Sequence, residues 1–120
     1  MARILVIDDE ELVRFSIADI LAEAGHEVFE AENGREGISV LREQPVDIVI
    51  TDLLMPEQEG LETITTLRSQ WPDLPVIAIS GGGRTGNLDF LDSAKKLGAS
   101  ATLAKPFSRD EILTVLSTYI

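Results

Sequence analysis

Short apolar runs alternate with longer amphipathic stretches along the chain. The runs are rich in Ile, Val, Leu and Ala, and they cover residues 3–7, 27–31, 46–52, 74–79 and 100–104. In the run 46–52, Val49 and Ile50 are adjacent, so apolar and polar side chains do not alternate cleanly. This pattern is typical of a central strand that is buried on both faces of a parallel sheet. The run 27–31 is more polar, and we expect it to form an edge strand.

The stretches between these runs predict helices. In the first stretch, apolar side chains recur three and four positions apart, at Leu12, Val13, Ile17, Ile20, Leu21 and Ala24. The predicted helices cover residues 10–24, 34–43, 58–69, about 85–97 and 109–119. Strands that alternate with helices through right-handed crossovers predict an α/β fold, in which a doubly wound, five-stranded parallel sheet is flanked by five helices.

Residues that favour helix ends and turns stand near the expected boundaries. Asp9 is the predicted N-cap of the first helix, and Gly25 is its predicted C-cap. Ser108 and Glu111 have the spacing of a capping box, which predicts the start of the last helix. The run Gly81-Gly82-Gly83 predicts a flexible loop after the fourth strand.

The composition limits the classes of function. The chain has 120 residues, and we expect one domain over residues 1–120. Ten basic residues against 21 acidic ones give a net charge of −11, which argues against binding of nucleic acid through this domain. The absence of Cys excludes disulfides and thiolate metal sites. Because there is no apolar window of membrane-spanning length and no secretory pattern, we expect a cytoplasmic protein without a membrane partner.

Polar residues that can carry chemistry follow the predicted strands. Asp8 and Asp9 follow the first strand, and Asp52 ends the third. Ser80 follows the fourth strand, and Lys105 follows the fifth. Because the carboxyl ends of parallel strands share one edge of the sheet, we expect these side chains to gather there. Each residue alone is explained by a turn, a helix cap or a solvated surface position, whereas together they indicate a site.

Such a set of side chains suits phosphoryl transfer. Three carboxylates in a small space repel one another, and Mg²⁺ relieves the repulsion because it binds carboxylate and phosphate oxygens. A Lys ammonium and a hydroxyl can bind phosphoryl oxygens. An Asp carboxylate can act as the nucleophile and form an aspartyl-phosphate. The sequence therefore predicts a Mg²⁺-dependent phosphoryl site at this edge of the sheet.

The motifs at these positions resemble those of a known family. They are Val6-Ile7-Asp8-Asp9-Glu10, Asp52-Leu53-Leu54-Met55-Pro56 with Gly60, Ser80, and Lys105-Pro106-Phe107. Over its whole length the chain resembles the receiver domain of two-component response regulators, which has the flavodoxin-like or CheY-like fold. The resemblance implies the strand order 2-1-3-4-5. It also implies a phosphorylation-activated switch of a phosphorelay, which catalyses only its own phosphorylation and dephosphorylation and is not otherwise an enzyme.

The resemblance implies a role for each acidic residue of the site. Asp52 is the expected phosphoacceptor, which takes the phosphoryl group from a histidine kinase or a small phosphodonor. Asp9 is the expected direct Mg²⁺ ligand, and Asp8 is expected to act through water. The backbone carbonyl of Leu54 is a further expected ligand, so its side chain is free to vary.

The remaining motif residues are expected to bind the phosphoryl group and to change the conformation of the domain when it is phosphorylated. Lys105 is expected to contact the phosphoryl group, and the peptide bond to Pro106 is expected to be cis. Ser80 stands at the position of the switch Ser or Thr. Two features depart from the family pattern: Thr102 replaces a common aromatic switch residue, and Gly81-Gly82-Gly83 lengthens the segment that is expected to move.

The expected output surface consists of the fourth helix, the fifth strand and the fifth helix. Phe90 and Leu91 are adjacent on the predicted fourth helix, so both cannot point fully into the core. The expected partners are a histidine kinase or phosphotransfer protein, and a downstream protein or fused output domain, with a homodimer as a further expectation. The chain has no effector domain after its last predicted helix, so a stand-alone regulator and a fragment of a longer protein both stay open.

Three other classes of protein share parts of this pattern. A Mg²⁺-dependent phosphohydrolase with an aspartyl intermediate often has an acid two positions after the nucleophile, where this chain has Leu54, and His26 is expected at the opposite edge. A flavin or nucleotide carrier requires a Gly-rich phosphate loop where this chain has Asp8-Asp9-Glu10-Glu11. A receiver-like interaction module that is not phosphorylated usually lacks an acidic or Lys position, and none is missing here.

Overall fold

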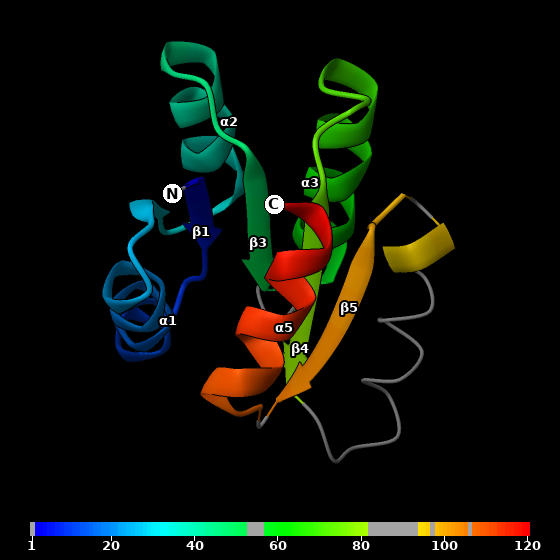
Figure 1. The fold of residues 1–120 in the computed structure, drawn as a ribbon. Helices are drawn as coiled ribbons and strands as arrows, with labels where there is room; N and C mark the ends of the chain where they lie inside the picture. The colour runs from blue at the N-terminus through cyan, green and yellow to red at the C-terminus, as the bar shows by residue number, and fades with distance from the viewer. Residues whose placement is uncertain (1, 53–56, 82–93, 97, 106) are drawn as a thin grey trace.

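The computed structural model describes residues 2–52, 57–81, 94–96, 98–105 and 107–120, with the side chains of all of these except 57–61, 80 and 81. The described residues form a five-stranded parallel sheet in the order β2-β1-β3-β4-β5 (Figure 1). The strands are β1 (Arg3–Ile7), β2 (Glu27–Ala31), β3 (Ile48–Asp52), β4 (Val76–Gly81) and β5 (Ala101–Lys105). The predicted sheet, the strand order that the resemblance implied and the edge position of β2 are all confirmed.

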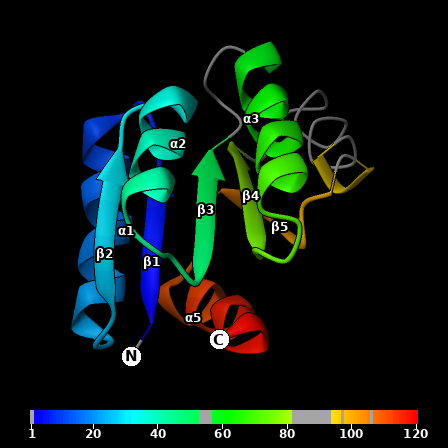
Figure 2. The same ribbon diagram turned by 90° about the horizontal axis from the view of Figure 1, so that it is seen from above.

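Helices cover both faces of the sheet. The helices with described bounds are α1 (Glu11–Glu23), α2 (Gly34–Glu43), α3 (Glu57–Gln70) and α5 (Arg109–Tyr119). Helices α2 and α3 lie on one face, and α1 and α5 lie on the other (Figures 1 and 2). The helix predicted over about 85–97 lies mostly outside the described residues, although Ala94, Lys95 and Lys96 are helical. None of the described helices is long and apolar enough to cross a membrane.

Each face of the sheet has its own apolar core. Beneath α2 and α3, the strands contribute Leu5, Ile7, Val49, Val76 and Ala78, and the helices contribute Leu41, Ile64 and Leu67. Beneath α1 and α5, the strands contribute Ile4, Val6, Ile48, Ile50, Ile77 and Ile79, and the helices contribute Ile17, Leu21, Ile112 and Leu116. Because β3 contributes to both cores, all five of its residues are buried, as its lack of alternation predicts.

Helix α1 presents a different side to the sheet from the one predicted. It buries Arg14, Ile17, Ala18 and Leu21, whereas Leu12 is 81% exposed. With 3.6 residues per turn, Leu12 points about 180° away from Leu21 and cannot share its face. The prediction that Leu12 belongs to the buried stripe is therefore wrong, because packing against the sheet centres the stripe on Ile17 and Leu21.

The predicted cap of α5 is confirmed, whereas each predicted cap of α1 is wrong by one residue. Ser108 makes both hydrogen bonds of its capping box at the start of α5. The C-cap of α1 is Ala24 and not the predicted Gly25, which follows Ala24 with φ +94°, a left-handed conformation that favours glycine. The N-cap of α1 is Glu10 and not the predicted Asp9, and its side chain makes no capping hydrogen bond. The Asp8 carboxylate accepts a hydrogen bond from the Glu10 N–H, just before the helix begins.

Strand β4 is shifted along the chain relative to the prediction. It begins at Val76 and not at Leu74, since the intervening Pro75 has no N–H to donate to a ladder. It continues through Gly81, which pairs with Lys105 of β5. The first glycine of the predicted loop therefore belongs to the sheet, whereas the next two lie outside the described residues.

Candidate functional site

Three charged side chains meet at the carboxyl edge of the sheet. Asp8 directly follows β1, Asp52 ends β3, and Lys105 ends β5. The Lys105 Nζ lies 2.5 Å from Asp52 Oδ2 and 3.5 Å from Asp8 Oδ2. Both aspartates are 1% exposed, and the Lys105 side chain is 17% exposed. The structure thus brings together three of the residues that the sequence predicts for the site.

The polar atoms of Asp8 are held by several elements. Its N–H donates to the Ala31 carbonyl at the end of β2 (3.1 Å), and its own carbonyl accepts from Arg14 Nη1 of α1 (2.9 Å). Its Oδ1 accepts from the Glu10 N–H (2.9 Å). Only Oδ2 is buried without a hydrogen-bond partner among the described residues, and it faces Lys105. The backbone is therefore fixed while one carboxylate oxygen stays available for a ligand.

Burial and neighbouring charges change the protonation of this cluster. Burial raises the pKa of Asp8 from 3.8 to about 7, and the neighbouring Asp52 carboxylate adds to the rise. Burial acts to lower the pKa of Lys105, but the hydrogen bond to Asp52 and the charges of both carboxylates outweigh it and raise this pKa above 10.5. Lys105 is thus a cation at neutral pH, and Asp8 holds its proton to a higher pH than an ordinary aspartate does.

The other predicted site residues are placed less closely, or lie outside the described residues. Asp9 is exposed beside the buried Asp8. The backbone of Ser80 lies in β4, one residue before its end, and Thr102 is half-buried in β5. Leu54 and Pro106 lie outside the described residues, so the carbonyl ligand and the cis peptide bond stay predictions.

The donor atoms at this edge fit a hard divalent cation. Within the described part of the chain, no three carboxylate or imidazole side chains converge on a point that a metal ion could occupy. Mg²⁺ needs only one or two carboxylates when water and phosphate oxygens complete its shell. Asp8 and Asp52 supply two carboxylates, and Asp8 Oδ2, which has no hydrogen-bond partner among the described residues, is an oxygen that the cation or one of its waters would satisfy. Asp9 and the Leu54 carbonyl stay the predicted further ligands.

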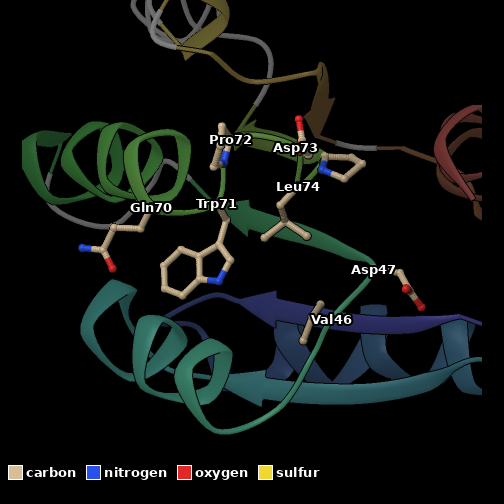
Figure 3. A pocket seen from close by; sticks show the side chains of 8 residues that line it. Val46, Asp47, Gln70, Trp71, Pro72, Asp73 and Leu74 are labelled. Atoms are coloured by element: carbon tan, nitrogen blue, oxygen red, sulfur yellow. The ribbon is translucent and has the colours of Figure 1, made fainter.

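A shallow hollow of about 440 Å³ lies at the opposite, amino edge of the sheet (Figure 3). The side chains of Val46, Trp71 and Leu74 form its apolar part, and Asp47 and Asp73 lie at its margin. In open α/β sheets, ligands bind beyond the carboxyl ends of the strands. The hollow is therefore separate from the charged cluster and supplies none of its residues.

Sequence reasoning missed Arg14, which is 6% exposed and bonds to the Asp8 carbonyl. The signal was present in the sequence, because positions 14, 17, 18 and 21 lie on one face of a helix. A charged residue on that face is rarely buried without a partner. A search for charged residues on the apolar stripe would have found Arg14 but not the atom that it contacts.

Comparison with known proteins places the chain in a family. The family model described as response regulator receiver domain matches residues 4–117. The chain is 37% identical over 117 residues to the chemotaxis protein CheY of Listeria monocytogenes, which covers 97% of this chain and 96% of that protein. It is 38% identical over 120 residues to a probable transcriptional regulatory protein of Picosynechococcus. This alignment covers 93% of this chain but only 46% of that protein.

Solved structures agree with this assignment. The crystal structure of a response regulator receiver domain protein from Clostridium thermocellum has a TM-score of 0.90 to this chain at 33% identity, and it covers 100% of this chain and 94% of that one. The chain thus spans nearly the whole length of some relatives and about half the length of the Picosynechococcus protein. It belongs to the family of response regulator receiver domains of two-component systems.

Proposed function

We propose that this chain is a phosphorylation-activated switch that accepts a phosphoryl group on Asp52 from a histidine kinase or a small phosphodonor. The observation that carries the proposal is the buried pair of Asp52 and Lys105, with 2.5 Å between Oδ2 and Nζ, and with Asp8 beside it. A buried carboxylate beside a fixed cation and a second carboxylate costs folding stability. Such a cost is typical of a functional site.

In the proposed reaction, a carboxylate oxygen of Asp52 forms a bond to phosphorus. The bond from phosphorus to the donor breaks, so acetate leaves from acetyl phosphate or an imidazole nitrogen leaves from a phosphohistidine. Lys105 then moves from the Asp52 carboxylate to a phosphoryl oxygen, where its charge stabilises the developing negative charge. When bound by Asp8, Asp9 and Asp52, Mg²⁺ supplies further charge neutralisation. The burial of the two aspartates keeps bulk water from the carboxylates.

The proposed output passes through the surface next to Lys105. A phosphoryl oxygen on Asp52 would accept a hydrogen bond from the Ser80 hydroxyl, and this bond forms only in the phosphorylated state. It would reposition the segment 81–97, which includes Phe90 and Leu91 and lies mostly outside the described residues. Strand β5 with Thr102, together with α5, completes the surface that we propose for a downstream protein, a fused output domain or a second copy.

The primary test is intact-mass spectrometry after incubation with acetyl phosphate and Mg²⁺. The proposal predicts one phosphoryl adduct in the wild-type protein, and no adduct in Asp52→Asn. EDTA should suppress the adduct, because the uncompensated carboxylates repel the donor. An adduct that persists in Asp52→Asn would place the acceptor elsewhere, and the absence of any adduct would favour an interaction module that is not phosphorylated.

A second test addresses the switch. Amide chemical shifts should change over 81–97 and 108–118 when beryllofluoride and Mg²⁺ are added to the wild-type protein. Ser80→Ala should still become phosphorylated but should show smaller changes in these two segments. Changes that stay confined to the neighbours of Asp52 would argue against an output through this surface. The receiver domain over residues 1–120 and its cytoplasmic location are further parts of the proposal.

A further inference from the structure

Arg14 is a buried cation that the proposed chemistry does not use. It lies on the sheet-facing side of α1 and is 6% exposed. Its Nη1 donates to the Asp8 carbonyl at 2.9 Å, and its Nε lies 3.1 Å from Glu30 Oε1. Its guanidinium also lies over the Phe15 ring, 5.3 Å from the ring centre. The side chain thus joins helix α1, the edge strand β2 and the first peptide of the segment Asp8-Asp9-Glu10 between β1 and α1, which we call the acidic loop.

Packing alone does not account for an arginine at this position. A guanidinium removed from water loses hydration, and a single ion pair seldom compensates for that loss. The partner Glu30 has a side chain that is 36% exposed, so its attraction is weakened by solvent. The hydrogen bond to the Asp8 carbonyl is the contact made on the buried side. The placement of Arg14 is therefore directed at the backbone of the acidic loop.

The Asp8 contacts indicate what this hydrogen bond controls. The Asp8 N–H is fixed by Ala31, but the orientation of the peptide between Asp8 and Asp9 depends on the carbonyl that Arg14 holds. That peptide sets the direction in which both carboxylates leave the chain. With the carbonyl held, Asp8 Oδ2 faces Lys105, buried and without a hydrogen-bond partner among the described residues.

We propose that Arg14 is a positioning residue of the phosphoryl site, which holds the peptide after Asp8 so that the carboxylates of Asp8 and Asp9 can bind the divalent cation. The proposal rests on the proposed function of Asp52. Arg14 acts through the Asp8 backbone and touches neither the cation nor the phosphoryl group. Residues that orient the ligands of a metal typically change its affinity by ten- to a hundredfold when they are mutated.

The test is a titration of the full chain with Mg²⁺, in which the amide chemical shifts of residues 8, 9 and 52 report binding. Arg14→Met should weaken Mg²⁺ binding by about tenfold, because the methionine keeps the apolar stem but cannot donate to the carbonyl. Arg14→Lys should recover part of this loss, because one ammonium can still reach the carbonyl. Glu30→Gln should change the affinity by less than about threefold, since the Nη1 hydrogen bond stays intact.

A matched control separates positioning from loss of stability. Leu21→Ala removes a buried side chain from the same face of α1, two turns away, and does not touch the acidic loop. It should lower the melting temperature without changing the Mg²⁺ affinity of the folded molecules. Equal Mg²⁺ affinity in Arg14→Met and the wild-type protein, or an equal loss in Leu21→Ala, would overturn the proposal. If the wild-type protein binds Mg²⁺ but forms no phosphoryl adduct on Asp52, the proposed function is wrong. The Mg²⁺ titration of Arg14→Met still decides whether Arg14 positions the cation ligands.

Discussion

At the amino edge of the sheet polar side chains hold the backbone, whereas at the carboxyl edge they face one another. Asp47 Oδ2 accepts from the Arg3 N–H at 2.8 Å in an exposed position at the amino edge. Ser100 Oγ accepts from the Val76 N–H at 3.2 Å on the same edge. Each of these bonds fixes a loop to the start of a strand. These bonds join segments that are distant in the sequence, and they satisfy backbone donors at the starts of the strands.

The carboxyl edge places its charges differently. Asp8 and Asp52 are buried around the single ammonium of Lys105, and one Asp8 oxygen has no hydrogen-bond partner in the described residues. Two carboxylates and one cation leave a net negative charge out of water, which opposes folding. The polar side chains of the amino edge thus bind the backbone of neighbouring strands, whereas the charged side chains of the carboxyl edge are available to a ligand. Mutations at the two edges should therefore have different consequences.

The largest expected effect comes from removing the cation at the carboxyl edge. Lys105→Met leaves two buried carboxylates without compensation, and we expect a loss of about 3 kcal/mol in the free energy of unfolding at pH 8. Urea unfolding in EDTA measures this loss. Mg²⁺ should restore part of the lost stability in Lys105→Met, because it replaces the missing positive charge. A loss below about 1 kcal/mol would mean that Lys105 compensates little of the carboxylate charge.

The pH dependence of stability should report on Asp8. Its native pKa of about 7 lies above the ordinary 3.8, so its contribution to stability is complete below pH 3.8 and is lost as the pH rises through 7. Relative to Asp8→Asn, the wild-type protein should lose at most about 1.4 kcal/mol per pH unit across this window. Urea unfolding of both proteins in EDTA at several pH values tests this. A stability difference that does not vary with pH would contradict the raised pKa.

The same carboxyl should make Mg²⁺ binding depend on pH. A cation must displace the proton from Asp8, so a pKa of about 7 predicts Mg²⁺ affinity about tenfold weaker at pH 6 than at pH 8. Mg²⁺ titrations at constant ionic strength, with amide chemical shifts as the readout, measure the two affinities. Equal affinities at the two pH values would show that Asp8 is already ionised at pH 6 or does not take part in binding.

The smallest effect is expected at the amino edge. Asp47→Asn keeps an oxygen acceptor for the Arg3 N–H, and the position is exposed. We therefore expect a change below about 1 kcal/mol in the free energy of unfolding. The phosphoryl adduct and the Mg²⁺ affinity should equal those of the wild-type protein. An Asp47→Asn protein that binds Mg²⁺ more weakly would remove the distinction between the two edges.

Much of the fold could be predicted because burial leaves a clear pattern in the sequence. The adjacent Val49 and Ile50 indicated a strand covered on both faces, and β3 has that environment. The rotation of α1 could not be predicted, because Leu12 suits the spacing rule and only packing against the sheet excludes it. The predicted N-cap of α1 was wrong by one residue, because Asp9 suits the capping preference but the helix begins one residue later, after Glu10.

The gathering of three charged residues could be predicted, but the geometry of their cluster could not. Asp8, Asp52 and Lys105 gather because the carboxyl ends of parallel strands share an edge, which sequence reasoning can use. The burial of Asp8 beside an exposed Asp9 does not follow from two identical neighbouring residues. The contact of Arg14 with the Asp8 carbonyl could not be predicted either, because it needs the positions of α1 and β1 together.

Asp52, held against Lys105 at the carboxyl edge, is the proposed phosphoacceptor. The most direct measurement is borohydride reduction after incubation with acetyl phosphate and Mg²⁺, followed by peptide mass spectrometry. Hydride reduces the acyl-phosphate of an aspartyl side chain to an alcohol and so marks the modified residue as homoserine. We predict homoserine at position 52 in the wild-type protein, and none there when phosphodonor is omitted. Homoserine at position 8 or 9, with Asp52 unchanged, would show that a different aspartate accepts the phosphoryl group.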